Sequence, residues 1–161
     1  MNELAVAVTV RDLNVGDIAM LGWSGSPTHL ASVREQLGRV QSGQAEYLAA
    51  CLPSGTPVGK LEIDYAREAS AGTLCQAAVH PILHSCGIGT LLVRVAEQRI
   101  SARGCATAEL AVEQENPRAR ALYERLGYAA YGEEPDEWDA EGPDGRVVRY
   151  HTICTLMRKS L

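Results

Sequence analysis

A glycine-rich turn directly before a segment with helical periodicity is the first feature of the sequence that could bind a ligand. It reads HSCGIGTLL, with Gly87 and Gly89 one residue apart. The first N–H groups of a helix have no partner within the helix, and the aligned peptide dipoles add positive charge there. Glycine lets a ligand approach the backbone closely. The turn is therefore consistent with a phosphate site, although an ordinary turn has the same pattern and neither the dinucleotide-binding nor the P-loop spacing is present.

A second stretch, ENPRARALYERLGY, follows about 25 residues later and predicts the start of another helix. Asn116 is a favoured N-cap residue, and Pro117 fits the first helical position, where no N–H is needed. Tyr123 lies in the middle of this helix. Taken alone, a tyrosine at such a position is usually a core or boundary residue.

The periodicity of apolar residues places both stretches in a mixed α/β sheet covered by helices. The segment Val58–Tyr65 alternates, with Leu61 and Ile63 on one face and Lys60 and Glu62 on the other, so it predicts a half-buried strand in an antiparallel hairpin with the strand before it. Strands are expected at 4–10, 45–52, 58–65, 73–79, 107–112, 128–133 and 147–157, and helices at 14–21, 30–43, 88–103 and 118–126.

Together the two stretches resemble the GNAT superfamily of acyl-CoA-dependent N-acetyltransferases. The pyrophosphate loop of that family, Gln/Arg-x-x-Gly-x-Gly/Ala after a strand ending near Val-x-Pro, corresponds to His84–Gly89 after Val79–Pro81. Its second hallmark, Asn-x-x-Ala-x-x-x-Tyr-x-x-x-Gly-Phe/Tyr, is intact from Asn116 to Tyr128. The resemblance implies one domain over residues 1–161 of α/β (α+β) class, with a single mixed, mostly antiparallel seven-stranded sheet, about four helices and splayed central strands.

The resemblance also implies acetyl-CoA, or CoA, as the acyl-donor cosubstrate. It implies that Val79 pairs its backbone with the pantetheine arm, that Asn116 adds a cofactor contact, and that Tyr123 protonates the departing thiolate. A phenol with a pKa near ~10 keeps its proton at neutral pH. Backbone amides would hold the pyrophosphate at His84, Ser85, Cys86, Gly87, Ile88, Gly89 and Thr90. The family usually carries a basic or amide side chain at the position of His84 and often another basic residue at that of Cys86, so we expect reduced charge assistance and somewhat weaker CoA affinity.

Transfer to an amine needs an acceptor for the amine proton, and the sequence does not select one. The candidates are Glu62, Glu109, Glu113, His80 and His151, or a chain of water molecules. Direct transfer in a ternary complex needs no cysteine intermediate, and Cys86 is expected beside the pyrophosphate rather than the thioester.

An acidic run at residues 133–144 includes Trp138 and is expected to form a loop. Such a run is often simply a solvated surface. In the family, however, the loop between the last two strands borders the acceptor site, where a negative rim would attract a cationic amine. Trp23 and His29 are candidates for the opposite wall of that pocket. A small cationic molecule or a peptide amine is therefore the expected acceptor.

The totals limit the remaining possibilities. The chain has 161 residues and a net charge of −5, which does not favour binding to nucleic acid or to anionic membranes. Five cysteines show no metal-ligand spacing, and neither a signal peptide nor an apolar run of membrane-spanning length is evident. We therefore expect a cytoplasmic protein with reduced thiols and no metal, and the resemblance allows a homodimer. A non-catalytic acyl-CoA sensor and a general nucleotide-binding domain are the competing hypotheses.

Overall fold

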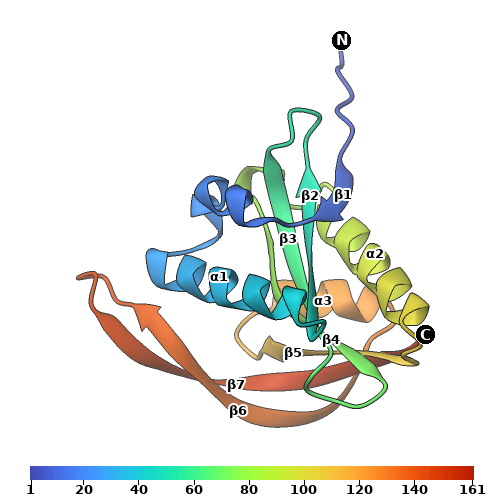
Figure 1. Ribbon diagram of the computed structural model, residues 1–161, viewed down its shortest axis with the longest axis vertical. Coiled ribbons are helices and arrows are strands. Elements are labelled where there is room, and N and C mark those ends of the chain that lie inside the picture. Colours follow the sequence, from blue (N-terminus) through green and yellow to red (C-terminus); the bar gives the residue numbers. More distant parts are fainter.

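The computed structural model describes all 161 residues as seven strands and three α-helices, joined by short 3₁₀ segments (Figure 1). The strands are β1 (Thr9–Asp12), β2 (Ala45–Cys51), β3 (Pro57–Asp64), β4 (Ala71–Val79), β5 (Thr107–Glu113), β6 (Ala129–Glu141) and β7 (Val147–Ser160). The α-helices are α1 (Pro27–Gln41), α2 (Ile88–Ala102) and α3 (Pro117–Arg125), and the 3₁₀ segments are Val15–Met20, Gly22–Ser24 and Pro81–Leu83. The first expected helix is thus 3₁₀ rather than α.

All seven strands form one sheet in the order β1-β2-β3-β4-β5-β7-β6. Only β4 and β5 run parallel, and every other neighbouring pair is antiparallel. The parallel pairing extends from Ala71 opposite Thr107 to Leu74 opposite Leu110, and both strands continue beyond it without pairing to each other. The expected mixed sheet with splayed central strands is therefore confirmed.

The divergence of β4 from β5 coincides with a bulge in β4. The β3–β4 register shifts between Lys60 opposite Ala78 and Glu62 opposite Cys75, so β4 contains one extra residue there. Gln76 lies at this point with φ of 51°, a left-handed conformation that is unusual for a residue other than glycine. A bulge of this kind bends its strand and ends regular pairing.

The helices divide between the two faces of the sheet, as Figure 1 shows. The α2 and α3 face holds the main core of 17 buried residues, among them Leu61, Leu92 and Met157. The α1 face holds a smaller cluster of seven, including Val33 and Tyr47. Burial of these apolar side chains is the main force holding the helices against the sheet.

The expectation of a half-buried β3 is wrong, because every residue from Pro57 to Asp64 is buried. Lys60, Glu62 and Asp64 are only 1%, 3% and 4% exposed, respectively. They point to the face that α1 covers, so the helix shields side chains that strand periodicity alone would leave in water.

The expectation of an acidic loop is also wrong. Residues 133–141 belong to β6, which pairs with β7 from Ala129 to Glu141 and forms a long hairpin extending beyond the end of α1 (Figure 1). Cross-strand contacts compensate for the poor strand propensity of this acidic segment. Trp138 packs on Tyr150 with ring centroids 4.9 Å apart, and Arg149 pairs with both Glu137 and Asp139.

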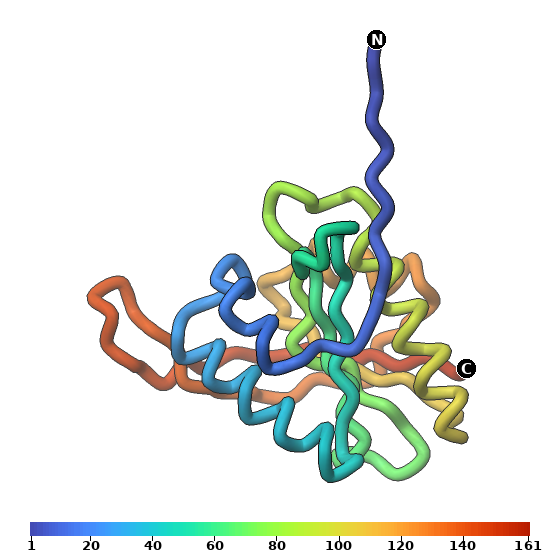
Figure 2. The backbone as a smooth tube through the Cα atoms, turned by 45° about the horizontal axis from the view of Figure 1, so that its top comes forward, coloured from blue at the N-terminus to red at the C-terminus, as the bar shows by residue number.

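The first strand is shorter than the alternation from Leu4 to Val10 predicts. Pairing begins at Thr9, opposite Cys51, which is the last residue of β2. Residues 1–8 therefore have no strand to pair with. Val8 still packs against the main core, whereas residues 1–7 are exposed and run away from the body of the molecule (Figure 2).

Candidate active site

A cavity of about 760 Å³ lies between β4, α2 and α3, on the side where β4 and β5 part. Its lining includes nine of the ten residues expected to contact the cofactor: Val79, His84, Ser85, Gly87, Ile88, Gly89, Thr90, Asn116 and Tyr123. Cys86 is the exception, since its side chain is exposed and lies outside the lining. The cavity extends to Trp23, whose ring packs on His80.

The N-terminus of α2 opens into this cavity. Gly87 is the N-cap with φ of 88°, a left-handed conformation that a side chain would strain. Its carbonyl accepts the first helical hydrogen bond from Leu91, at 3.0 Å. The N–H groups of Ile88, Gly89 and Thr90 consequently have no partner within the helix and are available to an anion.

Gly89 is needed for a different reason, which is space. A Cβ atom built there would lie 3.3 Å from the Leu122 side chain of α3. Close approach of the first turn of α2 to α3 therefore favours glycine at this position.

Both backbone polar groups of Val79 face the gap between the parted strands. The N–H of His80 donates to the Val58 carbonyl of β3 at 2.8 Å, and successive residues of a strand alternate in direction. Val79, one residue earlier, therefore directs its N–H and C=O away from β3, as an extended pantetheine arm would need.

The side chain of His84 already contacts that carbonyl. Its Nε2 lies 2.9 Å from the Val79 oxygen, and its Nδ1 lies 2.9 Å from the Arg118 guanidinium. A carbonyl can only accept and a guanidinium can only donate, so a neutral His84 with its proton on Nε2 satisfies both contacts. A pantetheine amide at Val79 must displace this imidazole or share the carbonyl with it.

Arg118, in the first turn of α3, is a residue that the sequence analysis missed. Its guanidinium also donates to the Ser85 hydroxyl at 3.0 Å, and it lines the cavity beside the glycine turn. A cation in the first turn of a helix opposes the helix dipole, so an arginine at this position was the sequence signal that could have indicated an anionic ligand. The positive charge absent from the loop itself is thus present nearby on α3.

Asn116 and Tyr123 occupy the α3 side of the cavity. Asn116 caps the helix as expected, with its Oδ1 accepting from the Ala119 N–H at 3.2 Å. The Tyr123 side chain is buried, and its ring meets Tyr128 edge-on. Burial, assisted by Cys75, raises the pKa of Tyr123 above its usual value, so the phenol is protonated at neutral pH.

Comparison with known families decides the assignment. The model of the acetyltransferase (GNAT) family matches residues 17–128, which is most of the chain and includes both sequence motifs. The chain belongs to the GNAT family of acetyltransferases. The resemblance inferred from the motifs is therefore confirmed.

Solved GNAT structures share the fold over nearly the whole chain. The ribosomal-protein-S18-alanine N-acetyltransferase from Escherichia coli superposes with a TM-score of 0.72 at 20% identity, covering 96% of this chain and 94% of the other. For the PaiA N-acetyltransferase from Thermoplasma acidophilum, solved with coenzyme A, the TM-score is 0.68 at 18% identity, with 96% and 99% covered. The spermidine N-acetyltransferase from Vibrio cholerae, solved with CoA and spermine, superposes with a TM-score of 0.70 at 18% identity, covering 95% of this chain and 95% of the other. At these identities the likeness concerns the fold.

The five proton-acceptor candidates of this GNAT chain lie in different environments. His151 is exposed and paired with Glu137, and Glu113 accepts a hydrogen bond from the Tyr150 hydroxyl. The others lie on or near β3, β4 and β5. The Nδ1 of His80 accepts from the Ile82 N–H, and burial raises the pKa of Glu109, with Glu68 adding to the effect.

Glu62 differs from the other four candidates. It is buried beneath α1, and its Oε1 has no hydrogen-bond partner. Burial and the neighbouring Asp64 raise the pKa of Glu62 to about 7, although the Arg39 guanidinium 3.5 Å away opposes the rise. This carboxylate is thus poised to exchange a proton near neutral pH.

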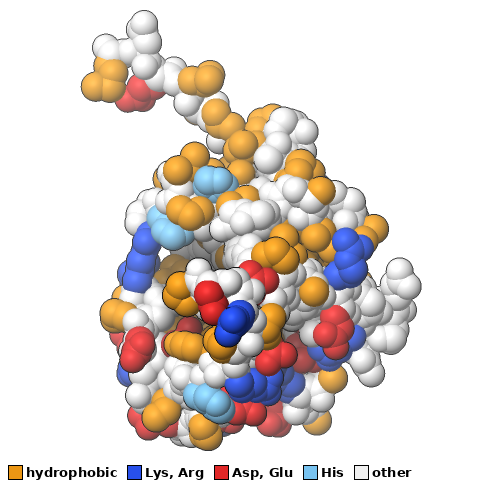
Figure 3. Space-filling view, turned by 90° about the vertical axis from the view of Figure 1, so that its left-hand side faces the viewer, with side chains coloured by type: hydrophobic (Ala, Val, Ile, Leu, Met, Phe, Trp, Pro, Cys, Tyr) orange, Lys and Arg blue, Asp and Glu red, His pale blue; other side chains and the backbone are white.

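The hairpin adds further carboxylates on the same face of the sheet. In the cross-strand register, Glu134 of β6 lies opposite Cys154 of β7, and Cys154 lies opposite Glu113 of β5. Asp136 and Trp138 follow Glu134 at alternate positions and share its face. Figure 3 views the molecule from the side toward which the hairpin extends in Figure 1, and charged side chains of both signs are concentrated in the lower half of that view.

Two further observations concern ligands and membranes. No three His, Cys, Asp or Glu side chains are grouped as metal ligands would be. None of the helices combines the length and hydropathy needed to cross a bilayer.

Proposed function

We propose that the protein transfers the acetyl group of acetyl-CoA directly to a primary amine in a ternary complex. One observation carries the proposal: a single cavity joins the free N–H groups at the start of α2 to the Tyr123 side chain. An anion-binding helix N-terminus and a phenol that line one cleft match a donor with a diphosphate and a reactive thioester.

The residues of the cavity fit acetyl-CoA. The N-terminus of α2 and the Arg118 guanidinium suit the diphosphate. Between parted strands, the Val79 backbone can pair with the amides of the pantetheine arm, and apolar side chains such as Leu83 and Leu122 cover it. The ten expected cofactor residues are retained in this proposal, with Cys86 contributing only its backbone.

In the reaction, a C–N bond forms as the neutral amine attacks the thioester carbon, and the C–S bond breaks. The Tyr123 hydroxyl supplies a proton to the departing thiolate, whose basicity is comparable with that of a phenolate. Backbone N–H groups of β4 facing the gap stabilise the negative charge on the carbonyl oxygen. No covalent enzyme intermediate is needed.

We assign the amine proton to Glu62, through water. The support is its burial, its Oε1 atom, which accepts no hydrogen bond, and its pKa of about 7, which suits a base working at neutral pH. Glu113, His80 and His151 each engage one side-chain atom in a hydrogen bond or a close ion pair, and Glu109 lies toward the paired end of β5.

For the acceptor, we propose a small cationic amine that approaches along the face shared by Glu113, Glu134 and Asp136. Carboxylates raise the local concentration of cations, and the Trp138 ring offers a flat surface for one. The relatives named above include an enzyme for spermidine and one for the alanine of a ribosomal protein, so a peptide amine is the other class to test.

The test is a thiol-release assay with acetyl-CoA and a panel of polyamines, aminoglycosides, amino acids and N-terminal peptides. Turnover that is fastest with polycationic amines supports the proposal. Tight binding of CoA without turnover on any amine would favour an acyl-CoA sensor. Binding of ATP or NAD, with no binding of CoA, would overturn the proposal and favour a nucleotide-binding domain.

A further inference from the structure

Lys60 is a buried cation that the proposed mechanism leaves without a role. Its side chain on β3 is 1% exposed, on the face that α1 covers. The ammonium donates to the Gln76 carbonyl at 2.8 Å and to the Tyr47 hydroxyl at 3.3 Å. Burial lowers the pKa of Lys60 to about 8, an effect that Glu62 opposes, so the charged form still predominates at neutral pH. Burying a cation is costly unless it is hydrogen-bonded, so these two contacts hold the charge in the interior.

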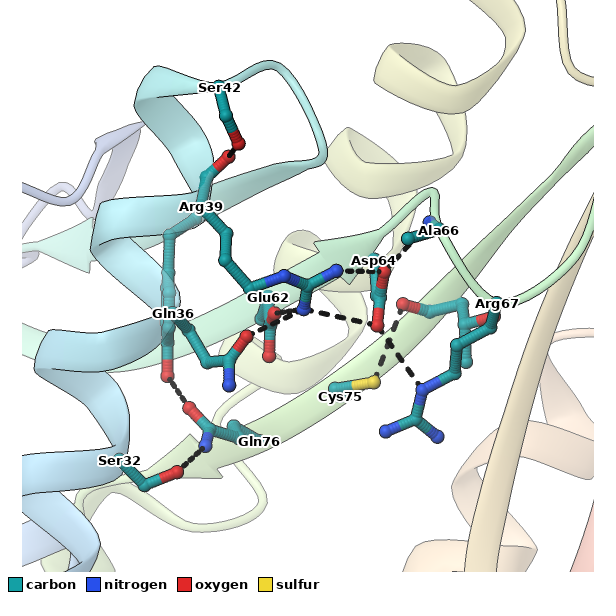
Figure 4. A network of polar contacts seen from close by, with 12 residues as sticks. Ser32, Gln36, Arg39, Ser42, Glu62, Asp64, Ala66, Arg67, Cys75 and Gln76 are labelled. Atoms are coloured by element: carbon teal, nitrogen blue, oxygen red, sulfur yellow. Dashed lines mark hydrogen bonds and ion pairs between the residues drawn. The ribbon is translucent and has the colours of Figure 1, made fainter.

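Both Lys60 contacts lead to Gln76, the bulge residue of β4. The Gln76 side chain is held separately: its Oε1 accepts from the Tyr47 hydroxyl at 2.7 Å, and its Nε2 donates to Ser32 of α1 at 2.9 Å. Figure 4 shows this side chain reaching Ser32. The side-chain contacts hold the left-handed residue in place, and Lys60 holds the direction of its carbonyl.

That direction fixes the next N–H group. In a trans peptide the C=O and the N–H point in opposite directions, so a Gln76 carbonyl aimed at Lys60 turns the Ala77 N–H away from α1. Strand alternation adds that this N–H does not face β3, since the His80 N–H faces β3 and Ala77 lies three residues earlier, next to the paired residues Ala78 and Val79. Ala77 lines the cavity.

We propose that Lys60 is a positioning residue, which orients and polarises the Gln76–Ala77 peptide so that the Ala77 N–H stabilises the thioester oxygen. The inference rests on the proposed function, since it needs acetyl-CoA in the cavity. A cation on the carbonyl end of a peptide draws electron density toward itself and makes the N–H at the other end a stronger donor. Lys60 acts through the peptide and does not touch the substrate.

The test is the infrared carbonyl stretch of ¹³C-labelled acetyl-CoA bound to the enzyme without an acceptor. A donor on the thioester oxygen lowers this frequency relative to that of the free donor in water. We expect a downshift in the wild type and its loss in Lys60→Met, with kcat falling about tenfold to 100-fold and CoA affinity changing less than threefold. Loss of one such donor typically costs 10²–10³-fold, and misalignment should cost less. A merely structural role would not move the frequency.

Lys159→Met is the matched control, because Lys159 pairs with Glu97 on the α2 face, away from Gln76. It should keep the downshift. If Lys60→Met does not fold, the comparison is made between Glu62→Gln and the double variant Lys60→Met/Glu62→Gln. The double variant removes both charges, so Glu62 is not left buried without Lys60. A downshift that is absent in the wild type or unchanged without Lys60 overturns the inference. Failure of the wild type to bind acetyl-CoA would instead refute the proposed function itself.

Discussion

The two faces of the central sheet are stabilised in different ways. On the α2 and α3 face, 17 buried apolar residues form a continuous core, and the cofactor contacts proposed there come mostly from the backbone. On the α1 face the apolar cluster has seven residues, and buried polar side chains lie beside it, including Lys60, Glu62, Asp64 and Thr73. Apolar burial therefore dominates the first face, whereas the second holds several charged side chains in a buried setting.

Two neighbouring carboxylates on the α1 face show the difference within one strand. Asp64 is buried, but hydrogen bonds from Arg39 at 2.7 and 3.3 Å and from the Ala66 N–H outweigh burial, so its pKa is lowered. Glu62, two residues away, shares Arg39 only at 3.5 Å, and its pKa is raised. Figure 4 shows Arg39 between the two. Asp64 thus pairs closely with α1, while Glu62 has a weaker contact with Arg39 and a raised pKa.

The largest effect is expected from Tyr123→Phe, which removes a hydroxyl from the α2 and α3 face without disturbing the core. Loss of general acid catalysis should lower kcat by about 100-fold, within the range typical of such groups. Tyr128→Phe is the control, because Tyr128 lies against Tyr123 but donates to Glu97 instead. Steady-state kinetics check this. A Tyr123→Phe enzyme that kept more than a third of wild-type kcat would refute the acid assignment.

Glu62→Gln should separate activity from stability on the opposite face. We expect kcat at pH 7.5 to fall at least tenfold, because the proton acceptor is lost. In the wild type, the folded state keeps the Glu62 proton up to about pH 7, whereas the unfolded chain releases it near its ordinary value of 4.5. Wild-type stability from this group therefore falls as pH rises from about 4.5 to 7.

The neutral amide of the Glu62→Gln variant avoids that loss. Above pH 7 the variant should therefore unfold with a free energy higher by on the order of 1–3 kcal/mol, and the advantage should vanish near pH 4. Urea unfolding at several pH values measures it. Lower stability than the wild type at pH 8 would show that Glu62 is a structural partner of Arg39 rather than a strained base.

The sequence predicted the local structure of the α2 and α3 face better than that of the α1 face, and the reason is physical. The glycine turn, the Asn116 cap and Tyr123 belong to local motifs, whose geometry depends on residues close in the chain. The environment of Lys60 and Glu62 depends on α1, a helix that packs across β3 from another part of the sequence. Periodicity identifies which residues share a face, but it does not show what covers that face.

The hairpin and Arg118 were missed for related reasons. Residues 133–141 have a composition typical of loops, and only the pairing with β7 makes them a strand. Arg118 reaches Ser85 across 33 positions in sequence, so its role depends on how α3 packs against α2. Both cases are tertiary effects that override local preference.

Arg118→Ala examines whether binding of acetyl-CoA at the α2 and α3 face also depends on a side-chain charge. Charge-assisted contacts to an exposed phosphate should be worth about tenfold, so KM for acetyl-CoA should rise about tenfold with little change in kcat. The effect should shrink at high salt. Arg120→Ala is the matched control, because Arg120 lies on the same helix and pairs with Glu124. Equal effects of the two substitutions would contradict a specific role for Arg118.

The smallest effect is expected at the hairpin, where alternate residues of β6 provide an internal control. Glu134→Gln/Asp136→Asn removes two charges from the face shared with Glu113, and KM for a cationic amine such as spermidine should rise about three- to fivefold at low salt. Glu137→Gln/Asp139→Asn removes equal charge from the opposite face, where both residues pair with Arg149, so KM should change less. Long-range attraction depends on net charge alone, whereas a binding surface depends on which side the charges face. If both pairs raise KM equally and salt abolishes both effects, the hairpin only steers cations toward the protein, and the acceptor must bind elsewhere on the α1 face.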